Sequence, residues 1–305
     1  MATEKGLNIT AVCWHLGYSK QAYYKTKKLN LTKLNDQAKV KQKVLSIRST
    51  MPRLGTRKLY YLLQEAFKSD GIKMGRDSLF RLLKEEHLLI QKKRKYTITT
   101  DSKHFMFKHP NLVKELVVKR PEQVWVADIT YIPVAKGFNY LHLITDAYSK
   151  KIVGYEMCDN MTTISTQKAL KMALKGRRYH DKLIHHSDRG LQYCSALYTG
   201  LLKENNIDIS MTINGDPYEN AVAERVNGIL KDEFGLSDPI STPYEAEKMV
   251  RQAVEIYNTQ RPHLSNHYVT PMKMHEQSQI VPRLWHKKGR NTLQSAPTSV
   301  TLFIN

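Results

Sequence analysis

Three runs of β-forming residues decide the fold: Val124-Trp-Val-Ala-Asp-Ile-Thr-Tyr-Ile-Pro-Val, then Tyr140-Leu-His-Leu-Ile-Thr-Asp-Ala-Tyr, then Lys151-Ile-Val-Gly-Tyr-Glu-Met. β-Branched and aromatic residues dominate each run, and Gly137 marks a turn between the first two. Because short turns join the runs, the pattern predicts three consecutive antiparallel strands.

The chain after these runs alternates between helical and strand patterns. Helices are expected over 162–175, 196–205 and 219–234, with strands over 183–188 and 207–211 between them. The resulting order, β-β-β-α-β-α-β-α, predicts an α/β fold with a mixed five-stranded sheet and helices packed on its faces. One more helix is expected from Thr242 to about residue 259, because Pro243 suits a first helical turn.

The chain before these runs predicts an all-α region. Residues 9–27 resemble two short helices separated at Gly17, with Thr10 and Ser19 as N-caps. Two further helices are expected over 57–68, with Thr56 as N-cap, and over 78–87. Each pair resembles a helix-turn-helix, whose second helix can enter the major groove of DNA.

These patterns divide the chain into five expected parts. They are a helix-turn-helix-like segment (1–35), a helix-turn-helix DNA-binding domain (36–95), a linker (96–120), a catalytic core (121–275) and a C-terminal tail (276–305).

Positive charge is concentrated at the front of the chain. Residues 1–120 hold 27 Lys and Arg against 9 Asp and Glu, a net charge of +18, whereas residues 121–305 hold 21 against 19, a net charge of +2. A concentrated positive block favours a polyanionic partner, with DNA or RNA foremost, because neutralising phosphates releases counterions. The alternative is a basic protein whose charge serves only solubility.

Other features of the composition limit where the protein works. There is no apolar run of about 18 residues, so no membrane span is expected. The first residues lack an apolar signal core, which predicts a cytoplasmic protein. The three cysteines, Cys13, Cys158 and Cys194, are far apart, so neither a disulfide framework nor a cysteine zinc site is indicated.

Three acids occupy positions that this element order can bring together. Asp128 lies within the first strand, Asp188 ends the fourth strand just before Gly190, and Glu224 lies in the last long helix of the core pattern. A charged group inside an apolar strand is costly unless it is paired or binds metal. Clustered carboxylates suit two Mg²⁺ or Mn²⁺ ions, which can activate a water or a 3′-hydroxyl at phosphorus. Taken singly, an aspartate at such a position is more typical of a turn or cap residue than of a metal ligand.

Five motifs resemble the second-frame transposases of the IS-three class of bacterial insertion sequences, which share the retroviral integrase core. They are Gln123-Val-Trp-Val-Ala-Asp-Ile-Thr-Tyr, Leu143-Ile-Thr-Asp-Ala-Tyr-Ser-Lys-Lys-Ile-Val-Gly, His186-Ser-Asp-Arg-Gly-Leu-Gln-Tyr, Pro217-Tyr-Glu-Asn-Ala-Val-Ala-Glu and Tyr257-Asn-Thr-Gln-Arg-Pro-His. Between Asp188 and Glu224 lie 35 residues, a spacing typical of that family. The likeness covers about residues 40–275, and departures at Leu191 and Glu219 leave the three acids untouched.

This resemblance implies an RNase H-like fold in which Asp128, Asp188 and Glu224 bind two Mg²⁺ or Mn²⁺ ions. It implies that the protein cleaves and joins DNA strands at element ends and inserts them into target DNA. The expected partners are double-stranded DNA, further copies of this chain assembled on DNA, and a product of an upstream reading frame, either separate or fused by frameshifting. In a bacterial cell the protein would then be associated with the nucleoid.

Basic residues outside the acidic triad are candidates for DNA contact. Lys231 lies two helical turns after Glu224, where the resembled family has a DNA-contacting basic residue, and a solvated helix lysine is the alternative. The segment Arg53-Leu-Gly-Thr-Arg-Lys-Leu resembles the family's helix-turn-helix, which adds Arg53, Arg57 and Lys58. A basic strip that follows the second helix pair reads as a phosphate-contacting segment and comprises Lys92, Lys93, Arg94 and Lys95.

Three other assignments stay open from the sequence. His185 and His186 precede the second acid, where one of them orients substrate or both simply pack in the strand. Two further functions use the same features: a DNA-binding regulator with an inactive core, and another RNase H-like nuclease such as a ribonuclease or a retroviral-type integrase. The complete set of acids disfavours the regulator. The lack of a paired-cysteine zinc module disfavours the retroviral type, and the basic front half disfavours a ribonuclease.

Overall fold

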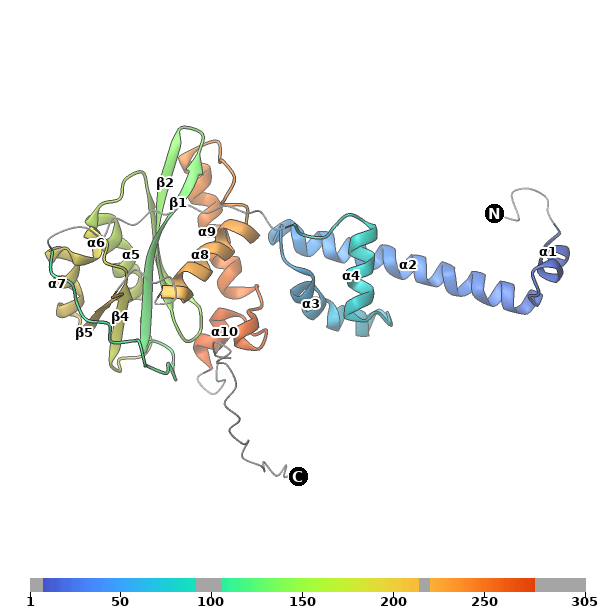
Figure 1. Cartoon of the computed structure of the whole chain (residues 1–305), viewed down its shortest axis with the longest axis horizontal. Coiled ribbons are helices and arrows are strands. Elements are labelled where there is room, and N and C mark those ends of the chain that lie inside the picture. The colour runs from blue at the N-terminus through green and yellow to red at the C-terminus, as the bar shows by residue number, and fades with distance from the viewer. Residues whose placement is uncertain (1–7, 92–105, 214–219, 278–305) are drawn as a thin grey trace, which may run out of the picture.

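The chain folds into a helical region followed by an α/β core (Figure 1). The computed structural model describes residues 8–91, 106–213 and 220–277. Helices of the first region are α1 (Ile9–His15), α2 (Lys20–Thr50), α3 (Thr56–Ser69) and α4 (Arg76–Glu85). The core contains β1 (Val124–Val134), β2 (Gly137–Asp146), β3 (Ile152–Cys158), α5 (Thr163–Lys175), β4 (Leu183–Ser187), α6 (Leu191–Cys194), α7 (Ala196–Glu204), β5 (Ile207–Met211), α8 (Ala221–Glu233), α9 (Pro243–Thr259), the 3-10 turn η2 (Leu264–Asn266) and α10 (Pro271–Glu276).

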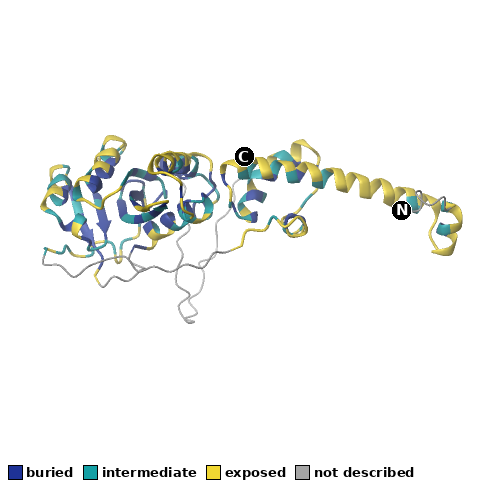
Figure 2. Ribbon diagram, turned by 90° about the horizontal axis from the view of Figure 1, so that it is seen from above, coloured by how far each residue is buried: buried dark blue, intermediate teal, exposed yellow. Residues whose placement is uncertain are grey.

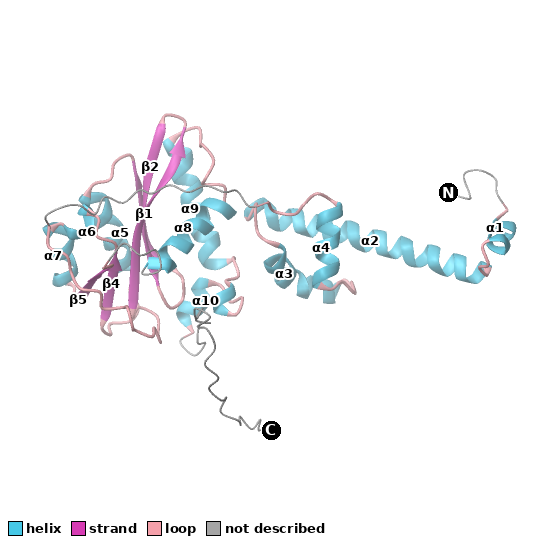
Figure 3. Ribbon diagram, viewed as in Figure 1, coloured by secondary structure: helices cyan, strands magenta, loops and turns pink. Residues whose placement is uncertain are grey.

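The five strands form one mixed sheet in the order β3-β2-β1-β4-β5. β1 pairs antiparallel with β2 and β2 antiparallel with β3, whereas β1 with β4 and β4 with β5 pair in parallel. Helices α5, α6 and α7 lie on one side of the sheet, and α8, α9 and α10 on the other (Figure 3). The predicted α/β fold with a mixed five-stranded sheet, and the predicted order of its elements, are confirmed. The short helices α6 and α10 were not predicted.

Alternation along β1 sends its side chains into two separate apolar layers. Trp125 and Ala127 pack in the layer that includes Leu170 of α5, whereas Ile132 packs in the layer that includes Leu230 of α8. Because successive strand residues face opposite sides of a sheet, the even-numbered residues of β1 point toward α8. Asp128 is among them, which places its carboxylate on the α8 face.

A glycine in β3 allows α5 to pack close to the sheet. A Cβ atom built on Gly154 would lie 2.2 Å from the carbonyl oxygen of Ala169 in α5, a distance at which the two atoms overlap. The glycine in the third quoted run is therefore a packing requirement, since any side chain there would push α5 away.

The first predicted helix pair is partly wrong. α1 ends at His15, Gly17 has a positive φ of 70°, and the Ser19 hydroxyl caps α2, as predicted. However, Asn8 and not Thr10 caps α1, and the second helix is not short: α2 continues for 31 residues. It therefore crosses the boundary predicted between residues 35 and 36, and its first half projects from the molecule with most residues exposed (Figure 2).

The second predicted helix pair is present as α3 and α4. Val44 of α2, Leu63 of α3 and Leu83 of α4 are buried in a common apolar cluster, so the three helices form one packed unit. Each helix begins slightly earlier than predicted, because Gly55 and Gly75 occupy the N-cap positions and Thr56 is already the first helical residue. None of the helices in the described part of the chain is both long and apolar enough to cross a lipid bilayer.

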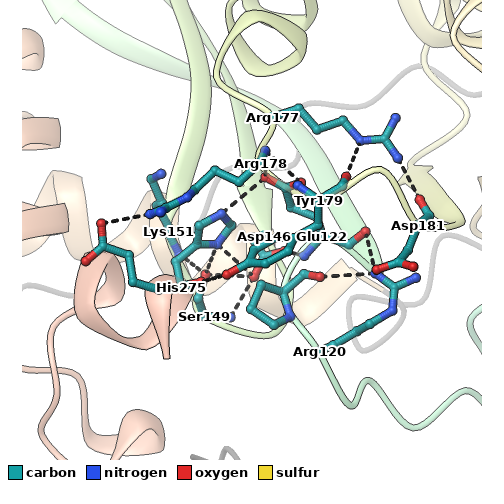
Figure 4. Close-up of polar contacts among 12 residues, drawn as sticks. Arg120, Glu122, Asp146, Ser149, Lys151, Arg177, Arg178, Tyr179, Asp181 and His275 are labelled. Carbon is teal, nitrogen blue, oxygen red and sulfur yellow. Dashed lines mark hydrogen bonds and ion pairs between the residues drawn. The ribbon is translucent and has the colours of Figure 1, made fainter. Parts of the chain in front are cut away.

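A buried polar cluster binds α10 to the start of β1 and the end of β2 (Figure 4). Nε2 of His275 in α10 lies 3.2 Å from Oε1 of Glu122, and its Nδ1 lies 3.0 Å from the Ser149 hydroxyl and 3.7 Å from Oδ1 of Asp146. All four side chains are at most 1% exposed. His275 therefore supplies the polar contacts that water would give to the Glu122 and Asp146 carboxylates at the surface.

Burial and hydrogen bonding oppose each other in this cluster. Burial alone would lower the pKa of His275, but hydrogen bonds to Asp146 and Glu122 raise it overall above 6.5. Burial alone would raise the pKa of both carboxylic acids, but hydrogen bonds from His275 and from nearby backbone N–H groups lower it overall. The charged forms of all three groups therefore stabilise the fold together.

This cluster makes stability depend on pH in a defined direction. A raised histidine pKa gives stability that is complete below pH 6.5 and is lost as the pH rises through the folded-state pKa. We expect His275→Gln to lower the free energy of unfolding by about 3 kcal/mol near about pH 6, and by progressively less toward about pH 9. Denaturant unfolding of both proteins across this range measures the difference. A constant difference between them would contradict the charged pairing of His275.

Candidate active site

Two of the three predicted acids are placed side by side by the parallel pairing of β1 with β4. Val126 of β1 is the register partner of His186 in β4. Two residues further along each chain stand Asp128 and Asp188, so both carboxylates leave the same face of the sheet at neighbouring positions. Asp188 is the first residue after β4, where the chain turns away from the sheet.

The turn after β4 holds the second carboxylate. The Gly190 N–H donates to Oδ1 of Asp188 at 3.0 Å, and a Cβ atom on Gly190 would lie 3.1 Å from the same oxygen. A larger residue at 190 would therefore press on the carboxylate, which explains the glycine of the His-Ser-Asp-Arg-Gly motif.

Helix α8 brings the third acid to the same face of the sheet. Nδ2 of Asn227 donates to Oδ2 of Asp128 at 2.6 Å, and Nδ2 of Asn220, just before the helix, donates to the Ala127 carbonyl at 3.0 Å. Glu224 lies three residues before Asn227, on the same face of α8. Asp128 and Asp188 are partly buried and Glu224 is exposed, so the site opens to solvent on the side of α8.

The electrostatics show that the acids act on one another. Burial, followed by repulsion from Asp188, raises the pKa of Asp128 from 3.8 to about 7, and Glu224 adds to the rise. The hydrogen bond from Asn227 works in the opposite direction by stabilising the charged form. Two partly buried carboxylates that resist simultaneous ionisation are a donor set suited to a hard divalent cation.

In the described part of the protein, the three acids are not yet close enough together to form a metal site. Among residues 8–91, 106–213 and 220–277, no three His, Cys, Asp or Glu side chains lie close enough together to hold a metal ion. The chemistry of the donors nevertheless fits Mg²⁺ or Mn²⁺, since all three supply carboxylate oxygens and two of them already repel each other.

Lys231 lies on the same face of α8, seven residues after Glu224. Burial lowers the pKa of Lys231, while the charge of Asp128 raises it, so the ammonium group belongs to the electrostatic surroundings of the site. Its predicted contact with DNA stays a prediction.

The other predicted DNA contacts differ in their surroundings. Arg57 is exposed at the start of α3. Arg53 donates through Nη2 to the Gln91 carbonyl at 2.6 Å, and Nζ of Lys58 lies 2.7 Å from Oε1 of Glu233. These two side chains are thus engaged within the protein. The remaining four candidates, Lys92, Lys93, Arg94 and Lys95, lie outside the described residues.

The two histidines before Asp188 are packed inside the core. Nε2 of His185 lies 2.9 Å from the Tyr198 hydroxyl, and Nδ1 of His186 lies 2.8 Å from the Ser210 hydroxyl. Burial lowers the pKa of His185 to about 3, which keeps the ring neutral. Of the two readings left open by the sequence, the structure favours packed strand histidines.

Sequence reasoning missed the two asparagines that hold Asp128 and its strand. Asn220 and Asn227 lie next to or within α8, and Asn227 is 6% exposed. The signal was available in the helical spacing, because residues 224, 227 and 231 share one face and both outer members had been singled out. A polar residue between them on that face was a candidate to contact the site.

Comparison with known proteins finds matches over most of this chain. Integrase core domain models match residues 118–217 and 205–271. The insertion element IS600 uncharacterized 31 kDa protein of Shigella sonnei is 38% identical over 270 residues, covering 87% of this chain and 97% of the relative. The transposase for insertion sequence element IS629 of Shigella sonnei is 35% identical over 208 residues, covering 68% of each chain.

Similar solved structures include retroviral integrases. The HTLV-2 integrase catalytic core domain in complex with magnesium has 21% identity and a TM-score of 0.42, covering 51% of this chain and 97% of that chain. The simian T-cell lymphotropic virus intasome in complex with a PP2A regulatory subunit has 18% identity and a TM-score of 0.47, covering 78% and 80%.

The matching domain models and the sheet define the class as integrase-core proteins. Because close relatives align along most of their length, the chain belongs to the insertion-sequence transposases that carry an integrase core domain. The resemblance inferred from the sequence motifs is thereby confirmed.

Asn227 offers a direct test of how the site is held. We expect Asn227→Ala to slow cleavage of DNA that carries element ends about tenfold, because a hydrogen bond to a charged group is worth about 1.5 kcal/mol or more. The apparent affinity for the same DNA should change less than about twofold, since the affected group is Asp128 and not a DNA contact. Single-turnover cleavage and a binding titration measure the two effects.

Asn205→Ala serves as the matched control, because Asn205 ends α7 and its side chain donates to the Leu201 carbonyl of the same helix. This control should keep wild-type cleavage. Equal cleavage rates in Asn227→Ala and wild type would show that Asn227 does not hold Asp128 for the reaction.

Proposed function

We propose that this transposase cleaves and joins DNA strands at insertion-sequence ends, with Asp128, Asp188 and Glu224 as the ligands of two Mg²⁺ or Mn²⁺ ions. The observation that carries the proposal is the parallel register of β1 and β4, which sets Asp128 beside Asp188. Burial, followed by repulsion from Asp188, raises the pKa of Asp128 to about 7, and a cation between the two carboxylates would relieve that repulsion.

The chain's own groups divide the work at the site. The three carboxylates would hold the ions and set where a phosphodiester meets them, while Asn227 fixes the orientation of Asp128. Two divalent cations, when bound, activate an oxygen nucleophile and stabilise the leaving oxygen at phosphorus. Lys231, on the same face of α8, is placed to bind a phosphate next to the site.

The proposed reaction proceeds without a covalent link between protein and DNA. Ser187, which precedes Asp188 in the chain, is 1% exposed and donates its hydroxyl to the Asp188 carbonyl at 3.0 Å, so it is not available as a nucleophile. Water would attack first and free a 3′-hydroxyl. That hydroxyl would attack a second phosphodiester in a direct transesterification.

The proposed substrates are double-stranded DNA at the element ends and in the target. The net charge of +18 over residues 1–120 supports phosphate binding by the helical region, with Arg57 as an exposed contact and the strip Lys92, Lys93, Arg94 and Lys95 as further contacts. We further propose that several copies of the chain assemble on DNA, because two ends must be joined. A product of an upstream reading frame as partner stays a prediction.

Charge-removing variants of the three acids test this function. We expect Asp128→Asn, Asp188→Asn and Glu224→Gln each to lower cleavage about 1,000-fold or more, because each removes a metal ligand whose ion stabilises the transition state by several kcal/mol. End binding should survive, because the substitutions keep the shape of each side chain. Cleavage by the wild type should require Mg²⁺ or Mn²⁺ and stop in excess chelator.

Asp232→Asn is the control for a nonspecific effect of removing charge from α8. Asp232 is exposed and is the residue just before Glu233. This variant should cleave like the wild type. Near wild-type cleavage by any one of the three acid variants would remove that residue from the site, and undiminished cleavage in chelator would refute metal dependence.

A further inference from the structure

The last residue of α8, Glu233, forms ion pairs with side chains from two separate parts of the molecule. Arg261, which follows α9, lies with Nε 2.8 Å from Oε2 and Nη2 2.8 Å from Oε1 of Glu233, a two-pronged contact. Lys58 of α3 adds its ammonium at 2.7 Å from Oε1. The side chains of Arg261, Glu233 and Lys58 are only 1%, 14% and 16% exposed, so water screens these contacts weakly.

Other contacts place the start of α3 against the same part of the core. The Arg53 N–H donates to the Glu233 carbonyl at 3.1 Å. Tyr61, one helical turn after Lys58, stacks on Tyr268 with ring centroids 4.9 Å apart and planes 15° from parallel. Lys58 and Tyr61 thus share the face of α3 that docks on the core, next to the layer of α8 and α9 (Figure 1).

The charges around Glu233 make this docking depend on its carboxylate. Burial alone would raise the pKa of Glu233, but Arg261 and Lys58 lower it to about 2. Burial, then repulsion from Arg261 and Arg225, lowers the pKa of Lys58. Glu233 acts in the opposite direction, because its negative charge attracts the charged lysine. Without its carboxylate partner, Lys58 would face two arginines, and α3 would be repelled from the core.

Helix α8 is therefore held at two points, both of which follow Glu224 in the chain. Asn227 ties the middle of the helix to Asp128, and Glu233 ties its last turn to α3 and Arg261. Glu224 lies nine residues before Glu233, about 13 Å along the helix axis. A shift of the clamped end moves the whole rigid helix, and Glu224 with it.

We propose that Lys58 and Glu233 are positioning residues, through which the DNA-binding helical region sets the place of α8 and so of Glu224 in the active site. This inference rests on the proposed function. It makes Lys58, expected from the sequence to contact DNA, a link between the two regions of the protein. Occupation of the helical region by an element end would then bear on the catalytic helix through the Lys58–Glu233 ion pair and the hydrogen bond from the Arg53 N–H to the Glu233 carbonyl.

Lys58→Met in the full chain tests the link, with Lys58→Arg as the matched control. Met keeps the aliphatic stem and removes the charge, whereas Arg keeps the cation and can still reach Glu233. The Arg261–Glu233 contact inside the core stays intact in both. The substrate is a duplex carrying the ends of the insertion sequence that encodes this chain. Should Lys58→Met fail to fold, Lys58→Gln carries the same comparison.

We expect Lys58→Met to lower kcat for strand cleavage about tenfold at saturating DNA, while Kd and its salt dependence stay within about twofold of wild type. Lys58→Arg should recover most of the loss. Hydrogen exchange in the last turns of α8 should be faster in Lys58→Met than in wild type and close to normal in Lys58→Arg.

Two results would overturn the proposal. Weaker binding with a salt slope reduced by about 1 would make Lys58 a phosphate contact, and an unchanged kcat would make the ion pair irrelevant to the reaction. Failure of the proposed function is seen separately, as absence of metal-dependent cleavage by the wild type. In that case hydrogen exchange still decides the link, because unchanged protection of α8 in Lys58→Met would refute it.

Discussion

The pairing of β1 with β4 forces two like charges onto one face of the sheet, and the rest of the site is built around that repulsion. Asp128 is held within β1, and Asp188 is held just after β4 by the turn in which the Gly190 N–H donates to its carboxylate. The conflict is visible in the pKa of Asp128, which burial and Asp188 raise to about 7. The fold therefore creates a site that favours the binding of cations, at the place where the proposed chemistry occurs.

The surrounding elements hold the two carboxylates in place from both sides of the sheet. Apolar packing of α5 against β3, which needs Gly154, holds the sheet from one side. On the other side α8 contacts Asp128 through the neutral amide of Asn227, which orients the carboxylate, and Lys231 of the same helix interacts with its charge. The His275 cluster satisfies Glu122 and Asp146 at a distance from the triad, so these buried acids do not compete for the same cations.

Local patterns predicted the sheet and the acidic triad, because strands, turns and motifs can be recognised from short stretches of sequence. Alternation in residues 124–134 and the turn at Gly137 were sufficient for the first hairpin. The length of α2 was missed although residues 20–50 contain neither Gly nor Pro, because the likeness to a helix-turn-helix suggested an early end. The pairing of Lys58 with Glu233 joins residues far apart in the chain, and no local pattern announces such a partner.

The central claim is that Asp128, Asp188 and Glu224 together hold the ions that cleave DNA. Anomalous X-ray scattering from crystals of the full chain grown with Mn²⁺ and an end duplex measures this most directly. The account predicts anomalous density at the carboxylates of all three residues, next to a DNA phosphate. Manganese bound elsewhere, or at Asp128 and Asp188 with the Glu224 carboxylate turned away, would contradict it.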